Sequence, residues 1–354
     1  MKKVALTVAS VIALTMPMSW ANAETLQDAL ASTYQNNPSL QAQRASVRGV
    51  DENVPQALSG WRPEVYAVGE VASQHSDVNP STPGTSRGSN PREASLIVSQ
   101  PLYSGGQTVA STKSAEAQVK AARADLLSTE QTIFQFAVEA YMNVLRDEAL
   151  VELNRNNSVV LRRQLDAAND RFEVGEITRT DVAQAQARLA DSISNVIQAE
   201  GNLRSTRANF ERIVGRPPLD LETPLVPEAF PESEEAALAT ALTNHPDIET
   251  AKFNEESSRY TIRATSGQLL PSLDLEGSLS TGRDVVGSGT ENDTARIGAV
   301  LTIPLYQSGS VYSQVRQARQ VNSQRMQEIE ETVRAIREAV IQSWEQLETS
   351  RSRI

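Results

Sequence analysis

The segment Phe172-Glu-Val-Gly-Glu-Ile-Thr-Arg-Thr-Asp-Val182 joins two long stretches of helix-forming sequence. No glycine or proline occurs from Gln107 to Val174, which predicts a single helix of roughly 100 Å at 1.5 Å per residue. Gly175 permits the left-handed residue that ends many helices, and Thr178 or Thr180 can cap the helix that follows. The segment therefore predicts the turn of an antiparallel helical hairpin.

Apolar and small residues recur after this turn at alternating spacings of three and four. The seam consists of Val182, Ala185, Leu189, Ser192, Val196, Ala199, Leu203, Thr206, Phe210 and Ile213. The same spacing is found at Leu161, Leu165, Ala168 and Phe172 in the preceding helix, and at Met326, Ile329, Val333, Ile336 and Val340 in a third. This is the pattern of coiled-coil packing. Helices of this length predict rods rather than a globular domain.

The chain repeats itself. Asn37-Pro38 is echoed by His245-Pro246, and Pro63 by Pro271 at the same interval. The remaining echoes are Pro101-Leu-Tyr-Ser-Gly-Gly106 with Pro304-Leu-Tyr-Gln-Ser-Gly309, and Tyr141 with Trp344. Each copy has the order helix, two strands, long helix. We predict a first structural repeat at 24–215, a Pro-rich linker at 216–232 and a second, incomplete repeat at 233–354, and we expect the chain to be a C-terminal truncation or fragment.

Four segments alternate with period two and predict strands. They are Glu64 to Ser76 and the segments around Leu96, Leu275 and Leu301. Each is about ten residues long, which is the length that a tilted strand needs to cross a bilayer. Four strands cannot close a barrel in lipid because their open edges leave backbone groups unpaired, so several chains would have to share one. Two chains would give eight strands, and three would give twelve with a lumen. Ordinary hairpins on a soluble domain are the other interpretation.

The N-terminus has the pattern of a secretory signal peptide. Lys2-Lys3 precedes an apolar run, and Ala21-Asn22-Ala23 predicts cleavage before Glu24, so 1–23 is assigned as signal peptide. The formal net charge of −11 argues against a nucleic-acid partner. The absence of Cys excludes disulfides, thiolate metal sites and a lipidated N-terminal Cys, and the two His residues leave no room for a His-rich metal site. No phosphate loop, zinc-protease motif or nucleophile elbow occurs, so we expect no enzyme activity and no cofactor.

The chain from Thr25 to Ile354 resembles the TolC family of outer-membrane duct proteins. The resemblance rests on the tandem copies, the Asn37-Pro38 helix, the prolines near the strand–helix junctions and the hairpin of Phe172 to Val182. It implies a mainly α fold with a small β part, in which a tandem repeat of long coiled-coil helices carries two transmembrane β-hairpins. It further implies a trimer that combines an α-barrel with a β-barrel. Glu24 in place of a lipidated Cys is more similar to the non-lipidated, type I secretion-like branch.

The resemblance also implies a function. Such a chain would form the exit duct of a tripartite export system, for type I protein secretion, drug efflux or both. It would be a passive conduit in the outer membrane of a Gram-negative bacterium, with a periplasmic helical tunnel. Its partners would be two further copies of itself in a homotrimer, a periplasmic membrane-fusion adaptor, an inner-membrane ABC or RND-type transporter, and outer-membrane lipid. The alternative is a periplasmic coiled-coil adaptor or structural stalk that does not span the membrane.

Two sets of residues are candidates for functional sites. The periplasmic hairpin tip, implied to contact the adaptor or narrow the aperture, comprises Gly175, Glu176, Thr178, Thr180, Asp181 and Val182. The strand–helix junctions comprise Pro63, Pro101, Gly105, Gly106, Pro271, Pro304 and Gly309. Each junction proline is expected to let a strand stop, because proline lacks the N–H that a central ladder needs. Carboxylates near the tip, such as Asp166, Asp170 and Glu173, predict either a negative mouth or a solvated helix face, and Asp181 either a gate or a helix N-terminal charge. The family's second tip is expected beyond Ile354.

Overall fold

The computed structural model describes residues 24–77, 86–225, 230–285 and 289–353, so the predicted signal peptide lies outside the described residues. The chain divides into two compact units, each discontinuous in sequence. Unit 1 comprises Met1–Asn37 and Thr132–Pro227, and unit 2 comprises Pro38–Gln131 and Glu228–Ile354. The division into two sequence repeats stays a prediction.

Unit 1 contains α1 (Leu26–Asn36), the second part of α4 (Gln107–Glu173) and α5 (Arg179–Val214). The predicted long helix is confirmed, since α4 runs without interruption for 67 residues. The predicted seam of α5 is also confirmed, because each of its ten positions is buried or half-buried while most residues between them are exposed. Gly215 ends α5 in the left-handed conformation, with φ of 89°.

The core of unit 1 is built around one tyrosine. The Tyr141 ring is fully buried and lies 6.3 Å from the Phe210 ring, centroid to centroid. Its hydroxyl donates to the carbonyl oxygens of Glu24 at 2.7 Å and Glu222 at 2.6 Å. Burial raises the pKa of Tyr141, which keeps this donor protonated. Glu24 also forms a parallel bridge with Leu221, so part of the predicted linker is packed into unit 1.

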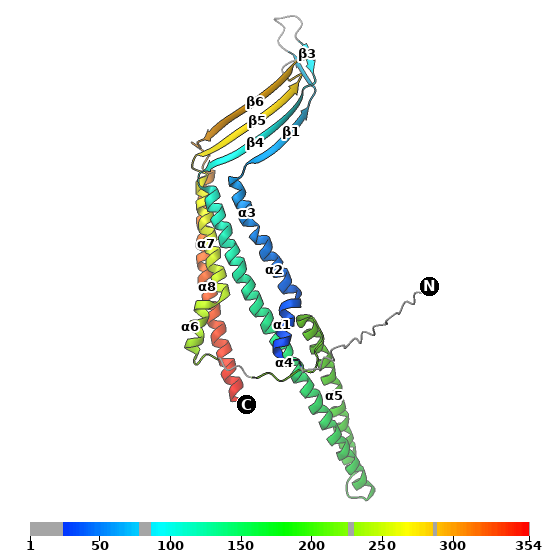
Figure 1. Cartoon of the computed structure of the whole chain (residues 1–354). Helices are drawn as coiled ribbons and strands as arrows, with labels where there is room; N and C mark the ends of the chain where they lie inside the picture. The colour runs from blue at the N-terminus through cyan, green and yellow to red at the C-terminus, as the bar shows by residue number, and fades with distance from the viewer. Residues whose placement is uncertain (1–23, 78–85, 226–229, 286–288, 354) are drawn as a thin grey trace, which may run out of the picture. The chain divides into compact units, whose positions relative to one another are not determined.

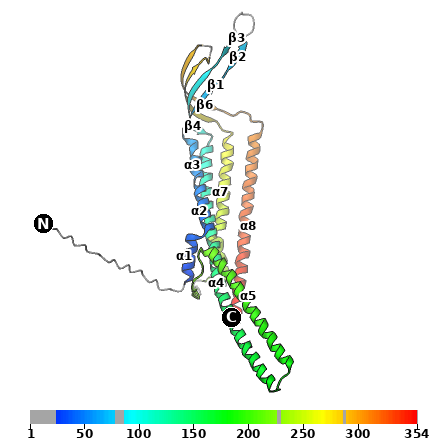
Figure 2. The ribbon, with the colours of Figure 1, turned by 90° about the vertical axis from the view of Figure 1, so that its right-hand side faces the viewer.

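Unit 2 contains a bundle of helices and the sheets. Its helices are α2 (Pro38–Asp51), α3 (Asn53–Leu58), the 3-10 helix η1 (Ser59–Trp61), the first part of α4, α6 (Glu234–Asn244), α7 (Pro246–Gly267) and α8 (Ser310–Ser352). Figures 1 and 2 show α7 and α8 side by side. Their contact includes the Asn322 amide, which is buried and donates to the Ser258 hydroxyl at 2.7 Å and to a Glu255 carboxylate oxygen at 3.0 Å. Among the described residues, no helix combines the length and apolarity that a membrane crossing requires.

The two hairpins form one antiparallel sheet. Its strands are β1 (Glu64–Val71), β4 (Arg92–Ser104), β5 (Ser272–Arg283) and β6 (Glu291–Thr302), in the order β1-β4-β5-β6, as Figure 1 shows. A separate pair consists of β2 (Gln74–Asp77) and β3 (Ser86–Ser89). The four predicted strands are present. The first predicted segment, Glu64 to Ser76, is interrupted after Val71, where β1 ends.

Among the junction prolines, only Pro304 lies where a strand has just stopped, two residues after the end of β6. Pro63 and Pro271 lie directly before β1 and β5, where a strand begins, so the expectation that each junction proline lets a strand stop is wrong for both. It is also wrong for Pro101, which lies inside β4, three residues before its end. The pairing of β4 with β5 shifts register between Pro101 and Tyr103. This bulge accommodates a residue without an N–H, and the strand continues past it.

Candidate functional site

The hairpin tip begins with a double hydrogen bond that ends α4. The N–H of Gly175 donates to the carbonyl oxygen of Phe172 at 3.0 Å, and the N–H of Glu176 donates to that of Arg171 at 2.9 Å. These i−3 and i−5 bonds form a Schellman motif, which requires a left-handed residue. Gly175 supplies it with φ of 80°. The side chains of Arg171 and Glu176, 4.0 Å apart and both exposed, lie over the same turn.

The start of α5 is fixed by a capping box between Thr178 and Asp181. The Asp181 carboxylate accepts from the Thr178 backbone N–H at 2.9 Å and from its hydroxyl at 2.7 Å. In return, the Thr178 hydroxyl oxygen accepts from the Asp181 N–H at 3.4 Å. The bond from the Thr178 hydroxyl, followed by that from its backbone, holds the pKa of Asp181 below its ordinary value. Of the two threonines considered as caps, Thr178 is the cap, and Thr180 lies exposed in the first turn.

The six predicted tip residues thus lie close together, in the turn after α4 and the first turn of α5. All are exposed except Val182, which begins the seam of α5 and is half-buried. The carboxylates of Asp166, Asp170 and Glu173 are on exposed positions of α4. A hollow of about 80 Å³ near Asp181 is far below the volume of an organic ligand site. The tip is therefore an exposed, largely polar surface.

The junction of β4 and α4 is set by close backbone approach. Gly105 has φ of 59° and Gly106 has φ of 76°. A Cβ added at Gly105 would collide with the carbonyl oxygen of Gly267 at the end of α7, whereas a Cβ at Gly106 would meet nothing within 4 Å. Gly309, with φ of 75°, precedes α8 in the same way. The sequence indicated that these three glycines are strand–helix junction residues, but it gave no indication of the role of Gly267. Gly267 contacts a segment distant in sequence, and such a contact leaves no pattern in the residues around it.

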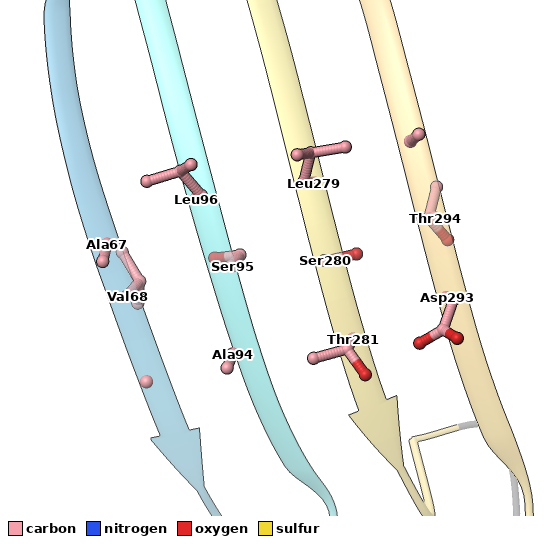
Figure 3. A pocket seen from close by; sticks show the side chains of 12 residues that line it. Ala67, Val68, Ala94, Ser95, Leu96, Leu279, Ser280, Thr281, Asp293 and Thr294 are labelled. Carbon is pink, nitrogen blue, oxygen red and sulfur yellow. The ribbon is translucent and has the colours of Figure 1, made fainter.

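A hollow of about 730 Å³ lies on the sheet itself. Figure 3 shows its lining side chains, which come from β1, β4, β5 and β6. Leu96 and Leu279 face each other across β4 and β5, and Asp293 is the one carboxylate in the lining. In the part of the chain that the structure describes, no three potential metal ligands come together. The hollow is an open, largely apolar sheet surface.

Comparison with known proteins gives the family. The sequence model described as "Outer membrane efflux protein" matches residues 29–216 and 237–354. This chain belongs to the outer membrane efflux protein family. It is 33% identical over 338 residues to the outer membrane efflux protein BepC of Brucella suis biovar 1, covering 94% of this chain and 72% of BepC. It is 28% identical over 324 residues to the outer membrane protein TolC of Vibrio cholerae serotype O1, covering 89% of this chain and 72% of TolC.

A solved structure shares the fold of this efflux protein. The outer-membrane channel OprN superposes with a TM-score of 0.77 at 19% identity, covering 93% of this chain and 75% of OprN. The prediction of a mainly α fold with a small sheet is thereby confirmed, and so are the predicted family and its outer-membrane, Gram-negative location. The chain is an outer-membrane efflux protein with a role in transport, and the alternative of a periplasmic adaptor or stalk is not supported. Its family is one of channels.

Proposed function

We propose that three copies of this chain form one channel, in which three four-stranded sheets make a twelve-stranded barrel and the helices make a periplasmic tunnel. The channel is a passive exit duct and not an enzyme. It works in a tripartite export system with a periplasmic adaptor and an inner-membrane transporter of the ABC or RND type. Its cargo is secreted protein, drug molecules or both.

The observation that carries this proposal is the pair of free edges on the four-stranded sheet. β1 and β6 are its outermost strands, and every residue of β1 is exposed. In lipid, each unpaired backbone N–H or C=O costs several kcal/mol, so an open edge in an outer-membrane protein needs another strand beside it. Two copies would give eight strands, whose interior side chains fill the barrel, whereas three leave a lumen for cargo.

The hairpin tip is the surface that we assign to the adaptor. Gly175, Glu176, Thr178, Thr180, Asp181 and Val182 form a turn held by local hydrogen bonds, so it presents a fixed shape without ordering cost on binding. Its exposed carboxylates add negative charge near the end of the rod. These features support a docking role and leave the choice of cargo to the pump.

The first test is native mass spectrometry on protein extracted from outer membranes in mild detergent. The expected particle has three times the protomer mass. A stable dimer would refute the twelve-stranded arrangement. A monomer recovered from the soluble periplasm would refute the shared channel altogether.

A further inference from the structure

The two hairpins of the sheet have the same register. Adding 208 to a residue number in β1 gives its counterpart in β5, and adding 203 to one in β4 gives its counterpart in β6. Under these offsets the pair Val65–Val98 becomes Leu273–Leu301, and the pair Glu64–Ser99 becomes Ser272–Thr302, both of which are observed. The repeat therefore extends from sequence landmarks to the backbone pairing itself.

The second strand of each copy ends differently, however. In copy one, β4 continues beyond the hairpin register and pairs with β5 through Pro101–Asp274, Tyr103–Leu273 and Ser104–Ser272, with Leu102 left out at the bulge. In copy two, β6 stops at Thr302, and the equivalent segment 304–307 belongs to no strand. Leu305 is 92% exposed and Tyr306 is 86% exposed. In copy one, β5 pairs with residues 101–104 of β4. Among the described residues, no strand pairs with the equivalent segment 304–307.

The counterpart of β5 in copy one is β1, the opposite free edge of the sheet. We propose that segment 304–307 extends β6 when copies assemble and pairs with the first residues of β1 of a second copy. The β4–β5 pairing gives the register: Tyr306 faces Val65 of the partner subunit, Gln307 faces the partner's Glu64, and Pro304 faces the partner's Tyr66. Leu305 takes the place of Leu102 as the bulged residue. This inference rests on the proposed function only in requiring that copies lie edge to edge.

The chemistry of the segment fits this assignment. A proline inside a central ladder is tolerated at a bulge, and Pro304 would occupy the position that Pro101 already occupies in β4. Backbone pairing would satisfy the N–H and C=O groups that follow Thr302, as it does for Tyr103 and Ser104. Tyr66, near the start of β1, and Tyr103, near the end of β4, are exposed, as is Tyr306 in the segment after β6. Aromatic residues are enriched where barrel strands meet the membrane–water interface.

The absence of Cys from the chain allows a clean cross-linking test. We would combine Tyr306→Cys with Val65→Cys in one chain and oxidise it in the outer membrane. Directly opposite residues have Cβ atoms within disulfide reach, whereas residues displaced by two positions do not. The expected product is a set of reducible, covalently linked dimers and trimers on a denaturing gel. The matched control combines Tyr306→Cys with Ala67→Cys, two positions along the same face, and should remain monomeric.

The outcomes separate this register from the proposed function. Cross-linking of the Tyr306→Cys, Ala67→Cys variant instead would show trimers with a different register. Absence of both cross-links in particles of trimer mass would show that 304–307 does not extend β6. Particles of monomer mass for the unaltered chain would refute the shared channel, and this inference with it.

Discussion

At the residue scale, two threonines two positions apart contribute differently to the same turn. Thr178 exchanges hydrogen bonds with Asp181, whereas Thr180 is exposed within the first turn of α5. The pKa of Asp181 is lowered from its ordinary value of 3.8. The stability from this carboxylate is therefore present above that value and is lost as the pH falls through the folded-state pKa. The cap is complete at neutral and mildly acidic pH.

Replacing Thr178 by Ala should loosen the start of α5. Loss of an N-cap costs about 1 kcal/mol, which corresponds to roughly fivefold faster opening of the first helical turn. Hydrogen exchange at pH 7, read by mass spectrometry on peptides covering residues 176–186, would measure it. Thr180→Ala is the control and should leave exchange unchanged. Equal acceleration by both substitutions would contradict the assignment of Thr178 as the cap.

At the scale of elements, periodic sequence was a good guide to the helices. The spacing of three and four from Val182 to Ile213 predicted the buried face of α5, because a rod packed along its length repeats its contacts every turn. Contacts that do not repeat along the chain produce no periodic pattern in the sequence. The pairing of β4 with β5, the position of Pro101 inside β4 and the approach of Gly105 to Gly267 each join distant segments, so the sequence alone did not predict them.

The core of unit 1 gives a prediction at this scale. Phe210 is fully buried against Tyr141 where α1, α4 and α5 meet, so Phe210→Ala should cost about 3–5 kcal/mol. Phe172, near the end of α4, is 42% exposed, and Phe172→Ala should cost much less. Helix unfolding followed by circular dichroism in detergent compares the two variants. Similar losses of thermal stability would show that the seam near the tip matters as much as the core.

At the scale of the whole molecule, the proposed channel predicts that the turn after β5 faces outward and that the turn after α4 faces the periplasm. The turn after β5 contains Val285, and the turn after α4 contains Val174, which is 78% exposed. The hairpin-tip residues were predicted from sequence as one turn, and the structure brings them together. Their contact with an adaptor depends on a second protein, which local sequence patterns do not describe.

Labelling on intact cells tests this topology. Val285→Cys should react with a polymer-linked maleimide too large to pass porins, because its turn faces outward in the proposed channel. Val174→Cys should react only after the outer membrane is permeabilised. Both positions are exposed, so a lack of reaction would show that the outer membrane excludes the reagent and not that the side chain is buried. Reaction of Val174→Cys in intact cells would contradict a periplasmic tip.

The shared register of the two hairpins has a consequence for what determines the number of chains in a ring. If β6 meets the partner's β1 as β4 meets β5, a strand experiences the same neighbour whether it belongs to its own polypeptide or to another one. Backbone pairing is then the same within and between chains, so it does not determine how many chains the ring contains. Under this proposal, the angle between successive hairpins decides the number of chains, and strand twist, the bulge at Leu102 and the bulge proposed at Leu305 contribute to that angle. Removing the bulge at Leu102 is therefore expected to change the mass of the assembled particle in native mass spectrometry.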